Sequence, residues 1–177
     1  MRKFLLLLLL IPLASIAQEG NFQIAILKYN GGGDWYSNLE TSLPNLIEFT
    51  NQNLQTNIKL EQAIVEPSSN ELFDYPFIHM TGHGNVVFNM EETENLRTYL
   101  MAGGFLHIDD NYGMDEFVRR EIKRIFPNEE LVEIPFSHPI YHQKFDFDNG
   151  LPKIHEHDGK PPMGYGIVVE GRLVLFY

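Results

Sequence analysis

The chain has 177 residues, which suits one domain and allows a sizeable buried core. The absence of cysteine excludes disulfide bonds and every mechanism that uses a thiolate. With 24 acidic and 13 basic residues the formal net charge is −11, and a surface of this sign repels nucleic acid and anionic lipid, so we expect neither as a partner.

Residues 1–17 have the three parts of a secretory signal peptide. Two basic residues precede an apolar run of about ten residues from Phe4 to Leu13, and Ser15-Ile16-Ala17 is a small-x-small cleavage site. The apolar run is shorter than the roughly 20 residues that span a bilayer, so no stable membrane span is expected after cleavage, an uncleaved anchor being the alternative. We therefore predict an exported protein, periplasmic or secreted, with residues 18–177 as its single domain.

The first part of this domain follows a strand, helix, strand pattern. Residues 22–29 and 58–65 are rich in apolar and β-branched residues and predict two strands. Between them, residues 36–51 have helical spacing, with Pro44 at the start or at a kink. Gly31-Gly32-Gly33 before this helix match neither dinucleotide-binding nor phosphate-loop spacing, so a flexible loop is favoured over an anion site.

The stretch from Tyr75 to Tyr112 predicts a second strand, helix, strand unit. Residues 76–80 form a short apolar run, and the glycines on either side of His83 predict a tight turn that lifts this histidine clear of the sheet. Residues 105–108 predict the next strand, which ends in Asp109-Asp110-Asn111.

Parallel strands joined by a right-handed helical crossover end at the same edge of a sheet. His83 and the Asp109-Asp110 pair are therefore expected to be neighbours. Open α/β sheets bind ligands outside the carboxyl ends of their strands, so this edge is the predicted site. All seven histidines lie between His79 and His157, which supports this expectation.

Two helices are predicted in the same half of the chain. Asn89 is suited to cap the helix that joins the two strands, and Gly103-Gly104 is suited to end it. Residues 115–126 have an amphipathic pattern that Pro127 stops. The outer face of this second helix holds four cations, for which a solvated face is favoured over an anion site: Arg119, Arg120, Lys123 and Arg124.

The last part of the chain predicts an elaborated loop region over residues 131–165. Prolines break up this segment, which is rich in histidine and aromatic residues, and such long loops are often functional. Residues 166–176 then predict a closing β-hairpin around Glu170-Gly171.

Five linked motifs occur in the same order as in a known family. They are Gly82-His83-Gly84-Asn85, Tyr99 to Leu106, Asp109 to Met114, Ser137-His138-Pro139-Ile140 and Leu151 to Glu156. By these motifs, nearly all of residues 18–177 resembles the domain-of-unknown-function family 4159. The resemblance implies a three-layer α/β domain with a mostly parallel sheet of flavodoxin-like or class I glutamine amidotransferase-like type, in bacterial exported or membrane-attached proteins. It implies no activity.

Two departures from this pattern matter. Amidotransferase-type domains place a nucleophilic cysteine at a strand-to-helix elbow, whereas this chain has Gly82-His83-Gly84 at a similar turn, so glutaminase chemistry is excluded. The family also continues beyond the strand at residues 173–177 into an acidic, tryptophan-containing motif and another helix. We therefore expect the domain to be C-terminally truncated relative to the family; if the chain is a fragment, part of the site would be absent with that segment.

Imidazole and carboxylate groups at the predicted edge suggest a metal-dependent hydrolase or lyase. His83, Asp109 and Asp110 are the candidate catalytic groups, and with His138 they are the candidate ligands of a divalent metal that would activate water. The HxH and HxxxH spacings of this chain are weak signals on their own. Further candidates for binding are Gly82, Gly84, Asn85, Asn111, Tyr112, His138 and His155.

Three other interpretations stay open. In a purely structural one, Asp109 and Asp110 cap the next helix, and histidines such as His79 are core or loop residues. A non-catalytic module would bind a carbohydrate, a peptide or another small molecule in an aromatic-lined cleft, and replacing Asp109 or Asp110 would then weaken binding without a loss of turnover. An interaction subunit would instead pair its strand at Tyr177 with a partner chain.

Overall fold

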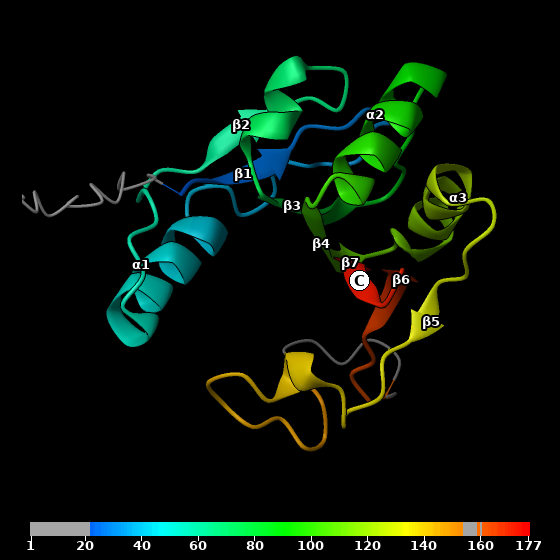
Figure 1. Ribbon diagram of the computed structural model, residues 1–177. Helices are drawn as coiled ribbons and strands as arrows, with labels where there is room; N and C mark the ends of the chain where they lie inside the picture. Colours follow the sequence, from blue (N-terminus) through cyan, green and yellow to red (C-terminus); the bar gives the residue numbers. More distant parts are fainter. Residues whose placement is uncertain (1–21, 154–158, 160) are drawn as a thin grey trace, which may run out of the picture.

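The computed structural model describes residues 22–153, 159 and 161–177, and these form one seven-stranded sheet of order β2-β1-β3-β4-β7-β6-β5 (Figure 1). The strands from β2 to β7 in this order pair in parallel, whereas β6 and β5 are antiparallel to their neighbours. The mostly parallel α/β fold is therefore confirmed. The strands are β1 (Ile24–Leu27), β2 (Ala63–Val65), β3 (Phe77–His83), β4 (Phe105–Tyr112), β5 (Val132–Glu133), β6 (Tyr165–Val169) and β7 (Arg172–Phe176).

Helices cover both faces of the sheet, which gives three layers (Figure 1). The residues of α2 and α3 share one apolar core with one sheet face, and α1 packs on the opposite face. Beside α1 on that second face lies the segment 134–147, which packs against the end of β7. The helices are α1 (Ser42–Leu54), α2 (Met90–Met101) and α3 (Asp115–Ile125), with the short 3-10 turns η1 (Asn70–Asp74) and η2 (Pro139–Tyr141).

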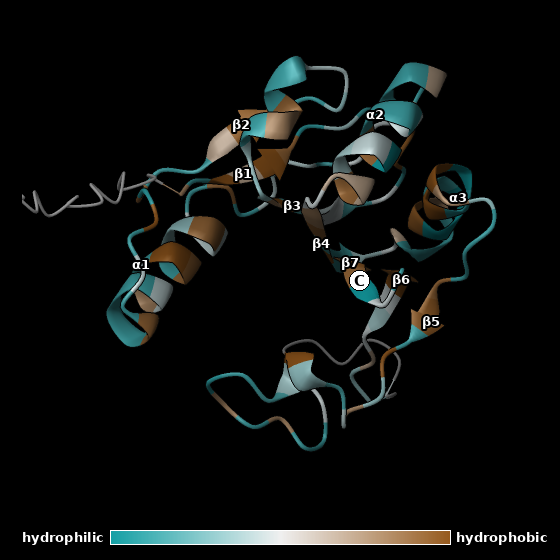
Figure 2. Ribbon diagram, viewed as in Figure 1, coloured by the Kyte–Doolittle hydropathy of each residue, from teal (hydrophilic) through white to brown (hydrophobic). Residues whose placement is uncertain are grey.

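The central strands are apolar toward both layers, as expected of a buried parallel sheet. In Figure 2, β1 is brown whereas much of α2 is teal, so the hydrophobic residues lie between the layers. Ile78 and Leu106 are fully buried beneath α2, and Ile26 is buried beneath α1. None of the helices in the described part of the chain is long and apolar enough to cross a membrane.

Several predicted boundaries differ from the structure. The helix predicted over residues 36–51 begins only at Ser42, after a series of turns. The strand predicted over residues 58–65 is regular only at its end, although Ile58 still forms a parallel bridge with Phe22. The predicted hairpin is confirmed, since Glu170 and Gly171 both have positive φ, as a two-residue turn between strands requires.

The tight turn predicted at residues 81–84 is wrong. β3 continues through His83, because Thr81 and Gly82 pair with Asp109 and Asp110 of β4. Pairing with a long neighbouring strand thus overrides the turn tendency of the glycines. The prediction that these two strand ends lie side by side is nevertheless confirmed.

Candidate functional site

A histidine and an aspartate meet at the carboxyl end of the sheet. Nδ1 of His83, the last residue of β3, lies 3.0 Å from Oδ2 and 3.1 Å from Oδ1 of Asp34, which follows β1. The backbone N–H of His83 donates to the same carboxylate. The imidazole side chain is 51% exposed, and no described residue bonds its Nε2 atom. We call Asp34 and His83 the dyad.

The carboxylate determines which nitrogen of His83 carries hydrogen. Partial burial acts to raise the pKa of Asp34, but the backbone N–H and the ring of His83 outweigh it and hold this pKa below its usual value. An ionised carboxylate only accepts hydrogen bonds, so Nδ1 of the neutral ring donates and Nε2 keeps a free lone pair. The dyad thereby presents a base toward solvent.

The three-glycine loop after β1 packs against the loop that follows β3. Gly33 N–H donates to the carbonyl of Asn85 at 2.9 Å, and Val87 N–H donates to the carbonyl of Asn30 at 2.8 Å. A Cβ atom on Gly33 would lie only 2.8 Å from the carbonyl oxygens of His83 and Asn85. Glycine is needed for this close approach, which brings Asp34 to His83.

Tyr29 lies beneath the dyad. Its hydroxyl donates to the carbonyl of Thr81 at 3.1 Å, and burial, together with the charges of Asp34 and Asp110, raises the pKa of this phenol. Gly82 has a φ of +146°, and a Cβ atom there would collide with the Tyr29 hydroxyl. The glycine before the catalytic candidate is therefore a packing requirement, since no other residue leaves room for the tyrosine.

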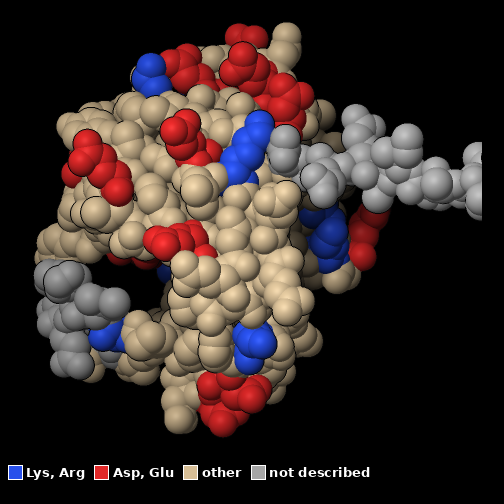
Figure 3. Space-filling view, turned by 90° about the vertical axis from the view of Figure 1, so that its left-hand side faces the viewer, with Lys and Arg blue, Asp and Glu red and all other residues tan. Residues whose placement is uncertain are grey.

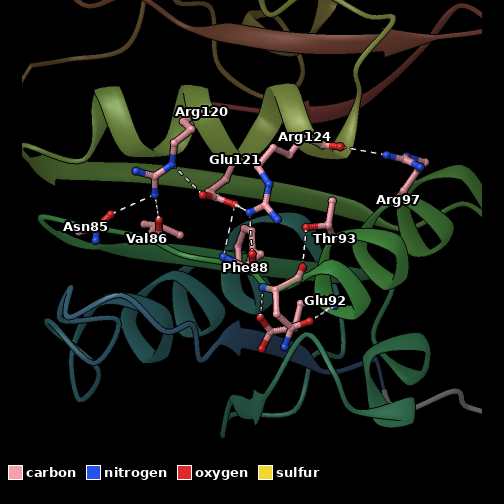
Figure 4. Close-up of polar contacts among 10 residues, drawn as sticks. Asn85, Val86, Phe88, Glu92, Thr93, Arg97, Arg120, Glu121 and Arg124 are labelled. Carbon is pink, nitrogen blue, oxygen red and sulfur yellow. Dashed lines mark hydrogen bonds and ion pairs between the residues drawn. The ribbon is translucent and has the colours of Figure 1, made fainter.

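A buried ionic network on α3 holds the loop that follows β3 (Figure 4). Glu121 is 2% exposed, and it accepts from Arg120 at 2.9 Å, from Arg124 and from the Phe88 N–H at 3.3 Å. Arg120 in turn donates to the carbonyl of Val86 at 2.5 Å, and Arg124 to that of Phe88 at 2.6 Å. Arg120 and Arg124 are exposed, as the solvated face predicted for α3 requires, but their guanidinium groups also bond the β3 loop.

Asn89 closes this loop in the manner expected of a helix cap. Its side chain accepts from the N–H of Glu92 at 2.9 Å, and the Glu92 carboxylate accepts from the N–H of Asn89 at 2.7 Å. This reciprocal capping box fixes the start of α2. The whole segment from His83 to Asn89 is held at both ends.

Asp110 is bonded to structural partners. Its carboxylate accepts from the N–H of Met114, which precedes α3, at 3.1 Å, and from the hydroxyl of Tyr177 at 3.2 Å. Burial and the carboxylates of Asp110 and Asp115 raise the pKa of Tyr177. Asp110 therefore supports the start of α3, as the structural interpretation expected, while Asp109 is exposed at the same edge.

Asn111 and Tyr112 form an irregular end of β4. Gly82 is the partner of Asp110 and His83 is the partner of Tyr112, so Asn111 is an extra residue in the ladder. The Nδ2 atom of Asn111 is buried without a partner among the described residues. The predicted binding residues Asn111 and Tyr112 thus lie directly beside His83.

A second histidine pair lies deeper in the sheet. The Nδ1 atoms of His79 and His107 are 3.0 Å apart, and the rings stack with centroids 5.1 Å apart. Burial lowers the pKa of both rings; for His79, which is 3% exposed, the pKa falls to about 3 with a further contribution from His107. The prediction that His79 belongs to the core is confirmed.

The remaining histidine candidates lie elsewhere. His138 caps η2, where its Nδ1 accepts from the N–H of Ile140 at 3.1 Å. His142 bonds Asp146 at 3.0 Å. His155 and the expected signal peptide lie outside the described residues. Within the described part of the chain, no three histidine or carboxylate side chains are gathered as a metal site would need, so the set of His83, Asp109, Asp110 and His138 is not assembled there.

Sequence reasoning missed the residues that position His83. Asp34 carried one usable signal, because it follows a glycine loop at the carboxyl end of the first strand, where ligand edges form. Glu121 carried none, since an acid between two arginines on a helix is typical of a solvated surface. Exposed charges are common on this protein: on the face presented in Figure 3, acidic groups are more numerous than basic ones.

Comparison with known proteins identifies a family whose description names no activity. The family described as Domain of unknown function (DUF4159) matches residues 23–177. No curated protein matches the chain.

Proposed function

The chain belongs to the DUF4159 family, whose description names no reaction, and we propose from its own residues that it is a hydrolase with His83 as general base. The observation that carries this proposal is the dyad. Asp34 accepts from Nδ1 of His83 at 3.0 Å, and half of the imidazole is exposed. A base oriented by a third group is the arrangement that activates water or a hydroxyl.

In the proposed step, Nε2 of His83 takes a proton from a water molecule as its oxygen attacks a carbonyl carbon. The Asp34 carboxylate stabilises the imidazolium that forms and keeps the ring in position. The imidazolium then returns the proton to the leaving group. General-base catalysis of this kind contributes on the order of 10²–10⁴ to the rate.

Asn85 is suited to stabilise the oxyanion that develops on the carbonyl oxygen. Arg120 donates to Oδ1 of Asn85 at 3.1 Å, which directs the amide nitrogen away from the arginine (Figure 4). The side chain is two residues from His83 on a loop that α3 anchors. A fixed amide donor near the base would act where charge develops.

The same contacts favour direct attack by water. No serine or threonine hydroxyl bonds His83 in the described part of the chain, and the protein has no cysteine. Nδ1 of His83 is committed to Asp34, and Asp110 is committed to Met114 and Tyr177. These commitments support a dyad better than the divalent metal set of His83, Asp109 and Asp110.

Ester hydrolysis by the purified protein tests this proposal. The probe is 4-nitrophenyl acetate, and the variants are His83→Gln and Asp34→Asn, with His138→Gln as a matched histidine control. We expect a loss of about 10² or more in kcat/KM for His83→Gln and an unchanged rate for the control. Equal rates in all variants would refute the dyad. Elemental analysis of the same preparation, with and without chelator, tests the metal-dependent alternative.

A binding module without turnover is the second candidate. It is supported by two exposed aromatic residues, Tyr36, two residues after Asp34, and Tyr112, the ladder partner of His83, which are 60% and 61% exposed. Such rings offer flat apolar faces to a carbohydrate or a peptide. In this case the variants at Asp34 and His83 would weaken binding of the ligand, and no hydrolysis of any probe would depend on them.

We also propose that the protein is exported with residues 1–17 removed, on the strength of the basic, apolar and small-residue segments at its start. Intact-mass measurement of the protein recovered from a secreting host tests this. A mass that matches residues 18–177 supports cleavage, and the full-length mass in the membrane fraction would favour an anchor.

A further inference from the structure

A histidine outside the dyad has both of its ring nitrogens engaged. Nδ1 of His142 lies 3.0 Å from Oδ1 of Asp146, and Nε2 of the same ring lies 2.7 Å from the carbonyl oxygen of Phe136. His83 differs, because only its Nδ1 atom has a partner among the described residues. The two contacts of His142 therefore indicate which protons its ring carries.

Both partners of the His142 ring are acceptors. A backbone carbonyl has no hydrogen to donate, and an ionised carboxylate only accepts. A neutral imidazole has a single N–H, so it bonds one partner and must turn the lone pair of its other nitrogen toward the second. The imidazolium has two N–H groups and bonds both. The arrangement around His142 thus fits the protonated ring.

The charges of the same segment stabilise the protonated ring. Hydrogen bonds to Asp146 and to the Phe136 carbonyl raise the pKa of His142. The negative charges of Asp146 and Asp148 act in the same direction, whereas partial burial opposes them. Oδ1 of Asp148 is 4.0 Å from Nδ1, too far for a hydrogen bond. The cation of this segment, Lys144, is exposed and makes no hydrogen bond to the ring.

The neighbouring elements bring no further charge to the ring in the described part of the chain. On the sheet side, Tyr141 packs on Phe176 of β7 with ring centroids 6.0 Å apart, and Glu133 of β5 acts on the Tyr141 hydroxyl. On the helix side, Glu48 is the one charged residue of α1, and it accepts from Gln52 at 3.1 Å. The protonation of the ring is therefore set within its own segment.

The ring joins the two ends of a strap, by which we mean residues 136–148. Phe136 begins this strap, and Asp146 lies close to its other end. Between them, Tyr141 is 1% exposed and belongs to the small core that also holds Phe176. The middle of the strap is therefore anchored on the sheet by apolar packing, which does not depend on pH.

The outer strap, residues 142–148, is held by fewer contacts, and most of its residues are exposed. The Phe147 N–H donates to the carbonyl of Tyr141 at 3.0 Å. The Phe145 ring reaches α1, where its centroid is 6.0 Å from that of Phe49. Because so little of this part is buried, the two hydrogen bonds of the imidazole are a substantial part of what holds it in place.

We propose that His142 is a pH-sensitive latch for the strap. The imidazolium bonds Asp146 and the Phe136 carbonyl at the same time and holds the outer strap closed. Loss of one proton breaks one of these two bonds. The outer strap then separates from Tyr141 and from α1, while Tyr141 stays on the sheet. This latch is independent of the dyad and of any reaction there.

The direction of the pH effect follows from the raised pKa of His142. The ordinary pKa of histidine is 6.5, and the closed strap raises it, so closure is favoured below pH 6.5. This contribution is lost as the pH rises through the raised pKa. Burial lowers the pKa of His79 and His107 instead, so that pair weakens the protein in acid and the two effects fall in different pH ranges.

Amide hydrogen exchange on the full chain, between about pH 6 and pH 9, tests the latch. The probe is the Phe147 N–H, and its protection is corrected for the intrinsic exchange rate at each pH. We expect this protection to fall about threefold to tenfold as the pH rises, which corresponds to one lost hydrogen bond. Nitrogen-15 shifts of the His142 ring in the same samples should show the loss of one N–H with the same midpoint.

Three variants separate the latch from general effects of pH. His142→Asn has no titrating ring, so the protection of the Phe147 N–H should be low and independent of pH. Asp146→Asn removes the charge that bonds the ring, so the midpoint should move to lower pH. Asp148→Asn is the matched control, because its carboxylate does not bond the ring, and its midpoint should stay closer to that of the wild type.

Two results would overturn the latch. One is constant protection of the Phe147 N–H in the wild type across the range in which the His142 ring titrates. The other is an Asp146→Asn midpoint that moves no more than that of Asp148→Asn. The comparison of these two aspartate variants decides the question even if His142→Asn does not fold.

Discussion

The Nδ1 atoms of His79 and His107 face each other at 3.0 Å inside the sheet, so one neutral ring donates and the other accepts. Protonation of the accepting ring would leave two donors opposed and a charge buried. We therefore expect the stability of the core to fall in acid.

The first prediction is a loss of stability between pH 6.5 and pH 3. The folded pKa of His79, about 3, is below its usual value of 6.5, so the unfolded chain binds more protons as the pH falls below 6.5. Stability is fully present above that pH and declines toward pH 3, by at most about 5 kcal/mol from this group. Urea unfolding at a series of pH values measures it.

The variant His79→Asn keeps a polar atom near Nδ1 and removes the titration. Its unfolding free energy should depend less on pH than that of the wild type. The variant His142→Asn provides the control, because hydrogen bonds to Asp146 and to the carbonyl of Phe136 raise the pKa of His142. Its contribution has the opposite sign, since it is present below pH 6.5 and lost above the raised pKa. A wild-type pH profile in His79→Asn would contradict this account.

Gly82→Ala should destabilise the protein by about 2–4 kcal/mol, because the methyl group collides with the Tyr29 hydroxyl in a backbone conformation that L-residues rarely adopt. Gly84→Ala is the matched control. Gly84 also has positive φ, but a Cβ atom there meets nothing within 4 Å, so only the strain of about 1 kcal/mol remains. Chemical denaturation compares the two, and equal losses would show that Tyr29 is not the cause.

Glu121→Ala should cost about 1–3 kcal/mol, because it leaves the buried Phe88 N–H without its acceptor, whereas the two half-exposed arginines can be solvated. Glu130→Ala, an exposed acid shortly after the same helix, should stay within about 0.5 kcal/mol of the wild type. The loop from His83 to Asn89 should also exchange its amide hydrogens faster in Glu121→Ala. Unchanged exchange would mean that α3 does not hold this loop.

Asp34→Asn should change the tautomer of His83. With the carboxylate present, the neutral ring carries its hydrogen on Nδ1. The amide can present its NH₂ group to Nδ1, which would move the hydrogen to Nε2 and remove the base. Nitrogen-15 chemical shifts of the imidazole report the tautomer directly. The same tautomer in wild type and variant would exclude an orienting role for Asp34.

The site was predictable as far as strand order determines it. Apolar runs and a helical crossover placed the ends of β3 and β4 side by side, and the pairing of Gly82 with Asp110 agrees. The partner of His83 was not predictable, because Asp34 is 49 residues away and reaches it only through a loop whose packing depends on glycines. Likewise, the alternation of β4 put His107 on one sheet face, but its contact with His79 required the register between strands.

Contacts outside the local sequence also explain why β3 extends through His83. The glycines on either side of His83 favour a turn when only the local sequence is considered. In the structure, backbone pairing with β4 and the hydrogen bond from the Tyr29 hydroxyl to Thr81 hold this segment extended. Glu121 illustrates the same limit for charge. Its burial depends on two arginines bending over the β3 loop, and helical spacing does not distinguish that arrangement from a solvated one.

The α3 network holds the β3 loop through backbone atoms, namely the carbonyls of Val86 and Phe88 and the N–H of Phe88. These atoms are present whatever side chains the loop carries. The residues around His83 can therefore change during evolution, or in a designed library, without loss of the clamp that shapes them. Specificity and scaffold are separately variable in this loop, which makes it a natural place to redirect the protein toward new ligands.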